Sequence, residues 1–98
     1  MRFCFADKKL EKLYTEEKDA HKYPDGVVDA FFDVMAVIAA AKDERDLRRL
    51  KGLRYEKLKG QRGHQRSLRL NSQFRLVVER EEDEEGRFLW IVGIEDYH

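Results

Sequence analysis

The sequence predicts an α+β fold, in which an N-terminal strand and two to three helices pack on one face of an antiparallel β-sheet. Two patterns indicate this fold. Apolar residues in the range 27–39 recur with helical spacing, and after Gly52 they alternate with polar residues as in strands. The chain has 98 residues, 42% of them hydrophobic, which is enough for one compact core, so we expect a single domain over residues 1–98.

The first half of the chain is expected to form the short strand and the main helices. The aromatic residues of the range 3–5 alternate as in a strand, and Cys4 between them is interpreted as a buried small hydrophobe. Asp7 is a typical N-cap for a first helix, and Pro24 suits the first turn of a second helix, which is expected to end near Ala41. The apolar stripe of that second helix consists of Val27, Phe31, Val34, Met35 and Ile38.

The second half is expected to add one or two further helical turns and then an antiparallel meander. The helical turns are expected in the range 43–51, and the strands in the ranges 55–58, 67–70, 74–79 and 88–94. The acidic run 81–86 is interpreted as a hairpin turn. Alternation in the range 67–70 puts its leucines on one face of the sheet and Ser67 and Arg69 on the other. The helices cover the apolar face, so the face that carries Arg69 and Arg75 is left for function.

The charge is distributed unevenly, although 20 basic and 20 acidic residues balance overall. The range 48–75 holds ten basic residues against Glu56 alone, a charge of +9, and the rest of the chain holds 10 basic against 19 acidic residues, a charge of −9. A basic stretch of this density indicates a polyanionic partner, of which nucleic acid is the commonest. The alternative interpretation is a charged face that is simply solvated.

Several classes of protein are disfavoured by composition. Cys4 is the single cysteine, so the chain has no internal disulfide and no cysteine-based zinc site. The histidines at 21, 64 and 98 lack the spacing of metal ligands, and no glycine-rich phosphate loop is present. We therefore expect no metal and no cofactor. No apolar run approaches the roughly 20 residues that span a bilayer, so a cytoplasmic protein without a membrane partner is expected.

Three segments resemble the HigB branch of the RelE/ParE toxins. They are Leu-Lys-Gly at 58–60, Ser-Leu-Arg-Leu-Asn-Ser-Gln-Phe-Arg-Leu at 67–76, and Glu-Asp-Tyr-His at 95–98. The likeness covers the range 55–98 at the level of residues, and the first half matches only in the order of its elements. The resemblance implies the RelE-like ribonuclease fold.

The resemblance also implies an activity and its partners. Toxins of this family cleave messenger RNA in the decoding site of the 70S ribosome and so arrest translation and growth. The expected reaction is the attack of a ribose 2′-hydroxyl on the adjacent phosphate, without a metal. Such a toxin is neutralised by a HigA-like antitoxin that carries a helix-turn-helix DNA-binding domain.

Matching positions carry over the site residues of the family. The implied catalytic residues are Lys59, Arg75, Asp96 and His98, and Tyr97 matches the same C-terminal triplet. Beside these matches we expect Arg62, Arg69, Gln73 and Tyr97 to contact RNA. Lys59 and Arg75 are expected to hold the phosphate and stabilise its growing charge, and His98 is expected to protonate the leaving oxygen. Asp96 is expected to orient a neighbour or to help with the 2′-hydroxyl proton. Glu56 stands where the best-known members have a histidine, so the identity of the general base stays open.

Two other functions are compatible with the same fold. The first is inhibition of DNA gyrase, as in the ParE relatives, and the second is RNA binding without catalysis. The co-location of Lys59, Arg75 and His98 separates the nuclease from the gyrase inhibitor, which does not need them, and a binding module would bind RNA with a steep salt dependence but would not cleave it. For the nuclease we expect Lys59, Arg75, Asp96 and His98 to converge on the helix-free face of the sheet.

Overall fold

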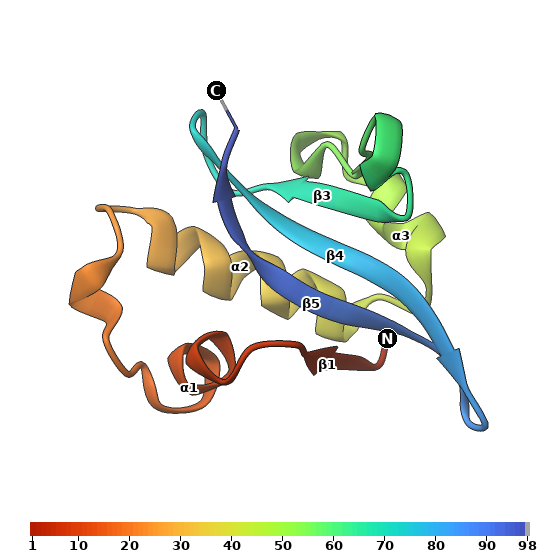
Figure 1. Ribbon diagram of the computed structural model, residues 1–98, viewed down its shortest axis with the longest axis horizontal. Helices are drawn as coiled ribbons and strands as arrows, with labels where there is room; N and C mark the ends of the chain where they lie inside the picture. Colours follow the sequence, from red (N-terminus) through yellow and green to blue (C-terminus); the bar gives the residue numbers. More distant parts are fainter. Residues whose placement is uncertain (98) are drawn as a thin grey trace.

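The computed structural model describes residues 1–97, in which three α-helices and three short 3-10 turns accompany a five-stranded sheet (Figure 1). In chain order the elements are β1 (Phe3–Phe5), α1 (Lys8–Glu16), η1 (Ala20–Lys22), α2 (Val27–Ala40), α3 (Glu44–Arg49), η2 (Lys51–Leu53), β2 (Glu56–Lys57), η3 (Gly60–Arg62), β3 (Gln65–Arg69), β4 (Phe74–Asp83) and β5 (Gly86–Asp96). The expected α+β fold is confirmed. Over residues 1–97, no helix combines the length and the apolar character that a membrane span requires.

The sheet has the strand order β1-β5-β4-β3-β2. The strands β2 to β5 form the expected antiparallel meander, with pairs such as Leu68 opposite Leu76. The first strand departs from the expectation of an antiparallel sheet, because β1 pairs parallel with β5 and places Phe3 opposite Leu89. The helices carry the chain from β1 to the far edge of the sheet, and the meander then returns to β1 with its last strand running in the same direction (Figure 1).

The core lies between the helices and one face of the sheet. Phe31, Met35 and Ile38 of α2 are fully buried, as their helical spacing predicts. They belong to one cluster with Leu10 and Leu13 of α1, Leu47 of α3, and Leu68, Leu76, Val78, Leu89 and Ile91 of the sheet. All three helices therefore pack on the same face, and the opposite face is left without a helix.

Truncating Phe31 should test this core. Phe31 is fully buried at the centre of the cluster, so the Phe31→Ala variant removes apolar contacts and leaves a cavity. We expect the free energy of unfolding to fall by about 3–5 kcal/mol, measured by urea denaturation. Asp33→Ala, at an exposed position of the same helix, is the control and should change stability by less than about 0.5 kcal/mol. Equal stability of the two variants would contradict this description of the core.

Two details of the first half differ from the sequence prediction. Cys4 is exposed rather than buried, because alternation along β1 turns Phe3 and Phe5 to the helices and Cys4 to the opposite face. The second helix begins at Val27 rather than at Pro24. Gly26 precedes it in the left-handed region, with φ of 82°, which a glycine adopts without strain.

The acidic segment 81–86 also differs from the expected hairpin turn. Most of it is strand, because β4 continues to Asp83 and β5 begins at Gly86, so the turn itself is short. Arg2 secures this end of the hairpin, since its guanidinium lies 2.6 Å from the Asp83 carboxylate. The result is a long β4–β5 ribbon that projects beyond the helices (Figure 1).

The last strand contains a β-bulge. Val78 pairs with Ile91, but the adjacent Val77 pairs with Gly93, which leaves Val92 outside the register of the described strands. A bulge of one residue reverses the alternation of side chains beyond it. The residues of β5 that follow Val92 therefore face opposite sides from those that an uninterrupted strand would give.

Candidate active site

The bulge assembles a row of charged side chains on the helix-free face. Register places Arg69 opposite Arg75 and Arg75 opposite Glu95, so three neighbouring strands contribute to the row. Ile91 before the bulge and Ile94 after it both contact the core, so Glu95 turns away from the core and towards Arg75. An uninterrupted β5 would have directed Glu95 at the helices.

A small pocket lies beside this row. Its volume is about 100 Å³, and it is lined by Arg54, Glu56, Ser67, Arg69, Arg75 and Tyr97. This volume is well below the roughly 300–1,000 Å³ of sites that enclose whole small molecules, so the pocket suits a group of the size of a phosphate. Glu56 reaches it because β2 pairs Glu56 with Ser67.

The approach to this pocket includes a strained residue. The backbone of Arg54 adopts φ of 46°, in the left-handed region that residues other than glycine rarely occupy. It follows η2 and directs the chain into β2, where Glu56 begins the strand. Strain of this kind tends to be retained at functional sites, because the surrounding structure must hold it in place.

Arg75 lies at the centre of the charged row, between Arg69 and Glu95. One of its terminal nitrogens lies 3.4 Å from Glu95 Oε1, and its guanidinium carbon lies 5.6 Å from the centre of the Tyr97 ring. Within residues 1–97 its Nε atom is buried and has no hydrogen-bond partner. A buried donor without a partner is unfavourable, and an oxygen of a bound ligand would relieve this cost.

Tyr97 continues along the sheet rather than folding back over it. The strand is longer than the expected range 88–94, because pairing with β4 extends β5 to Asp96. The backbone N–H of Tyr97 donates to the Gln73 carbonyl at 3.0 Å, and its hydroxyl donates to the Asn71 carbonyl at 2.9 Å. These bonds hold the ring beside the pocket.

Asp96 does not lie with Arg75 in the expected way. It pairs with Phe74, so alternation assigns it to the face opposite that of Arg75. Its Oδ2 accepts a hydrogen bond of 2.9 Å from Gln73 Nε2. The expected convergence on one face is therefore wrong for Asp96, and the physical reason is again the parity change at the bulge.

Arg62 contacts the protein through its whole guanidinium group. Its Nε donates to Gln65 Oε1 at 2.8 Å, and its two terminal nitrogens donate to the Glu95 carboxylate at 2.9 and 2.7 Å. This bidentate pair holds the pKa of Glu95 below its usual range. Sequence reasoning missed Glu95, although Gly93 inside the strand is a typical mark of a bulge that would have placed it.

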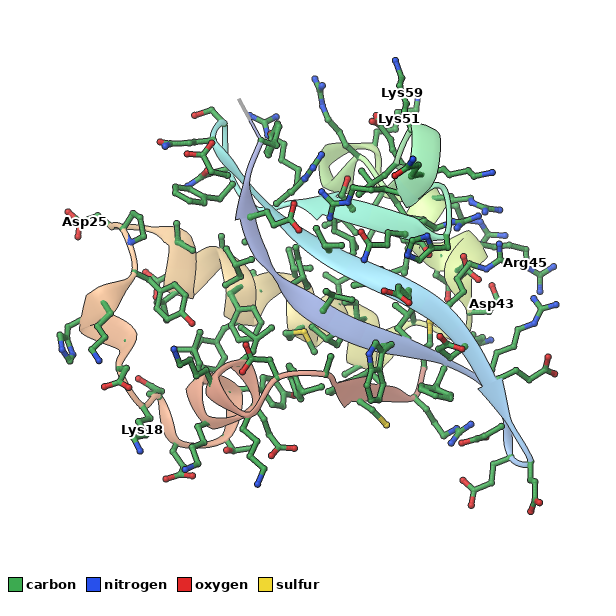
Figure 2. All side chains as sticks on the ribbon, viewed as in Figure 1. Lys18, Asp25, Asp43, Arg45, Lys51 and Lys59 are labelled. Atoms are coloured by element: carbon green, nitrogen blue, oxygen red, sulfur yellow. The ribbon has the colours of Figure 1, made fainter. Side chains whose placement is uncertain are left out.

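Lys59 stands apart from the pocket. It is exposed and immediately precedes η3, and Figure 2 shows its side chain extending away from the ribbon at the top of the molecule. His98 lies outside the described residues. Of the expected site residues, the structure thus brings together Arg69, Arg75 and Tyr97. Arg62 joins them through Glu95.

A second group of cations lies at the other end of the molecule, around α1 and η1. Within the described chain, a pocket of about 380 Å³ is lined by Lys8, Lys9, Lys12, Lys18, Asp19, Lys22 and Tyr23. Lys22 lies 3.8 Å from Asp19. Lys8 and Lys9 occupy the first turn of α1, where the helix dipole disfavours cations. Their positions therefore do not serve helix stability. We call these five lysines the α1 lysine surface.

Known proteins resemble this chain along most of its length. The family described as RelE-like toxin of the type II toxin–antitoxin system HigB matches residues 3–89. Toxin HigB-1 of Vibrio cholerae is 33% identical over 94 residues, which are 96% of this chain and 88% of that toxin.

Two solved structures of toxins also match this chain, and the first of them resembles it in fold. A YoeB/ParE toxin from Agrobacterium tumefaciens matches over 100% of both chains, with a TM-score of 0.58 and 16% identity. The toxin–antitoxin complex RelBE2 from Mycobacterium tuberculosis matches 98% of this chain and 96% of that chain, with a TM-score of 0.46 and 19% identity. With the family match and the similarity to Toxin HigB-1, this chain belongs to the HigB-like toxins of type II toxin–antitoxin systems.

Proposed function

We propose that this toxin is a ribosome-dependent endoribonuclease that cleaves messenger RNA and so stops translation in the cytoplasm. The observation that carries the proposal is the pocket that Glu56 lines together with Arg54, Arg69 and Arg75. A carboxylate and several cations around one small pocket suit the attack of a 2′-hydroxyl on the adjacent phosphate.

Four residues of the pocket, together with Lys59, have a proposed role in this reaction. Glu56 accepts the 2′-hydroxyl proton, the 2′-oxygen bonds to phosphorus, and the 5′-oxygen leaves, which gives a cyclic phosphate and a free 5′-hydroxyl. Arg75 donates to the phosphate oxygens as their negative charge grows, with its Nε as an available donor. Arg69 and Lys59 add positive charge, and the ring of Tyr97 supports a base by stacking.

His98 is proposed to protonate the leaving oxygen, since an imidazole exchanges protons near neutral pH. Asp96 would orient a neighbouring group at the end of β5, where it already accepts a hydrogen bond from Gln73. All the bonds made and broken involve the RNA and these side chains. We therefore expect EDTA, at levels that leave the ribosome intact, to leave cleavage unchanged.

The α1 lysine surface supports a large polyanion as the partner. A strand of messenger RNA in the pocket does not need cations at the opposite end of the molecule, but ribosomal RNA offers phosphates over a wide area. Within residues 1–97, the large hydrophobic side chains that are exposed are Leu50 and Tyr97, and neither belongs to this surface. It therefore lacks the apolar centre of a typical protein interface.

Removing these charges should weaken ribosome binding in a salt-dependent way. In a variant with Lys8, Lys9, Lys12 and Lys18 changed to Ala, we expect weaker binding and a shallower slope of log K against log salt, by about 0.7–0.9 for each phosphate that the variant no longer neutralises. Filter binding at several salt concentrations measures both quantities. The four corresponding Lys→Arg changes keep the charge and should keep wild-type binding. An unchanged slope in the Ala variant would exclude this surface from the interface.

A toxin of this family acts within a two-component system, and we propose a HigA-like antitoxin with a helix-turn-helix domain as its partner. Expression of the toxin alone should arrest growth, and co-expression of the antitoxin should restore it. Harmless expression of the folded wild-type toxin at high level would count against toxicity.

The decisive experiment is primer extension on messenger RNA in a translating extract, with and without the purified toxin. New 5′ ends within ribosome-bound codons support the proposed nuclease, and the same RNA without ribosomes should stay intact. Growth arrest with intact messenger RNA and inhibited DNA supercoiling would indicate a gyrase inhibitor. Ribosome binding without new 5′ ends would indicate a binding module that does not cleave.

A further inference from the structure

The turn that carries Lys59 is connected to the centre of the sheet by the side chain of Arg62. The turn is short, and the Gly63 N–H closes it by donating to the Gly60 carbonyl at 3.1 Å. From its end, Arg62 reaches Glu95, 33 residues away in the sequence, through two hydrogen bonds of 2.9 and 2.7 Å. A planar, bidentate pair of this kind fixes orientation as well as distance.

Glu95 links this turn to Arg75. Its Oε1 accepts from Arg62 at 2.9 Å and lies 3.4 Å from a terminal nitrogen of Arg75. Gln65 steadies the other side of Arg62, because its Oε1 accepts from Arg62 Nε and its Nε2 donates to Glu79. With every nitrogen of its guanidinium engaged by protein groups, Arg62 has less capacity to bind RNA than the sequence analysis predicts.

We propose that the Arg62–Glu95 pair is a positioning device, which fixes the turn that carries Lys59 relative to Arg75 so that both cations contact the same strand of RNA. This inference rests on the proposed nuclease function. Arg62 and Glu95 are positioning residues in this scheme, because they act through Lys59 and Arg75 and do not contact the reacting atoms. The bulge in β5 is what makes the pair possible, since it turns Glu95 to the helix-free face.

Kinetics can separate positioning from RNA contact. For Glu95→Gln and Arg62→Ala, we expect the single-turnover cleavage rate on ribosomes to fall about tenfold to a hundredfold, as for other small misplacements of reacting groups. Ribosome affinity should stay at the wild-type value. Arg62→Lys keeps the charge without the planar fork and should restore only part of the rate. A wild-type rate in Glu95→Gln, or a loss of affinity in Arg62→Ala that accounts for its slower cleavage, would overturn the proposal.

A double-mutant cycle tests the link to Lys59. Lys59→Ala should lower the rate less in the Glu95→Gln background than in the wild type, because the turn is already displaced there. Fully additive effects would show that the pair and Lys59 act independently, against the proposal. Glu81→Gln is the matched control, since it removes the same charge from an exposed position of β4 and should leave the rate unchanged.

Amide hydrogen exchange in the free toxin tests the same claim without activity. Glu95→Gln should speed exchange at Gly63 N–H about tenfold, because the turn opens more often once its anchor is weakened. Glu81→Gln should leave this rate unchanged. If the wild type does not cleave messenger RNA, the proposed function fails, yet faster exchange still supports positioning of the turn. Unchanged exchange in Glu95→Gln overturns the positioning itself.

Discussion

Replacing Arg75 by Ala should lower the rate of messenger RNA cleavage on the ribosome by about 10²–10³, the usual effect of removing a group aimed at developing charge. Arg75 lies in the central row of the helix-free face, and its buried Nε has no partner within residues 1–97. Glu95 keeps its bidentate bonds to Arg62 in this variant, so no carboxylate is left unpaired. The free energy of unfolding should therefore change little.

Single-turnover primer extension with saturating toxin measures this rate, and urea denaturation checks the fold. Arg75→Lys keeps the positive charge but lacks the planar fork and should cleave at an intermediate rate. Arg87→Ala removes the same charge from an exposed position of β5 and should cleave as the wild type does. Cleavage at the normal rate by Arg75→Ala would show that the phosphate binds elsewhere.

The helical core and the meander were predictable because burial imposes a period on the sequence. Phe31, Met35 and Ile38 follow helical spacing and are fully buried, and Leu68 and Leu76 follow the period of a strand and meet across the sheet. The hairpin 81–86 was not predictable in this way. Its charged side chains carry no apolar alternation, and the length of β4 depends on pairing with β5.

The row of charges was predictable only up to the bulge. The alternation of side chains within β3 and within β4 correctly places Arg69 and Arg75 on the helix-free face. The faces of Glu95 and Asp96 are the reverse of those expected from Ile91, because Val92 is an extra residue in the register. The alternation of apolar and polar residues does not reveal such an insertion. The one sign of it in the sequence of this strand is Gly93, because a glycine inside a strand often marks a bulge.

Glu56 illustrates a different limit of the sequence. In the sequence, Glu56 departs from the pattern of the family, because the best-known members have a histidine at this position. The structure places it in the pocket with Arg69 and Arg75, across from Ser67. A carboxylate therefore lines the pocket at the position where the family has an imidazole, and we propose that it accepts the proton instead. The sequence alone does not show which way Glu56 faces, because β2 has only two residues and therefore no clear alternation.

The corresponding experiment is the second of the two large effects. Glu56→Gln removes the proposed proton acceptor while keeping the size of the side chain, and we expect the single-turnover cleavage rate to fall by about 10²–10⁴. Stability should not change, because Glu56 is exposed at the edge strand of the sheet. Ribosome affinity should also stay at the wild-type value, since the residue is proposed to act only on the 2′-hydroxyl proton.

Glu56→His tests the chemical role rather than the mere presence of the side chain. An imidazole accepts a proton only above its pKa, ordinarily about 6.5, so this variant should recover part of the rate at pH 8 and lose it as the pH falls through that range. The dependence should follow this sign because the base must be unprotonated to act. Glu56→Gln should show no such recovery at any pH. If Glu56→Gln cleaves normally, or if Glu56→His stays as slow as Glu56→Gln across pH 6–8, Glu56 is not the base and another group must take the 2′-hydroxyl proton.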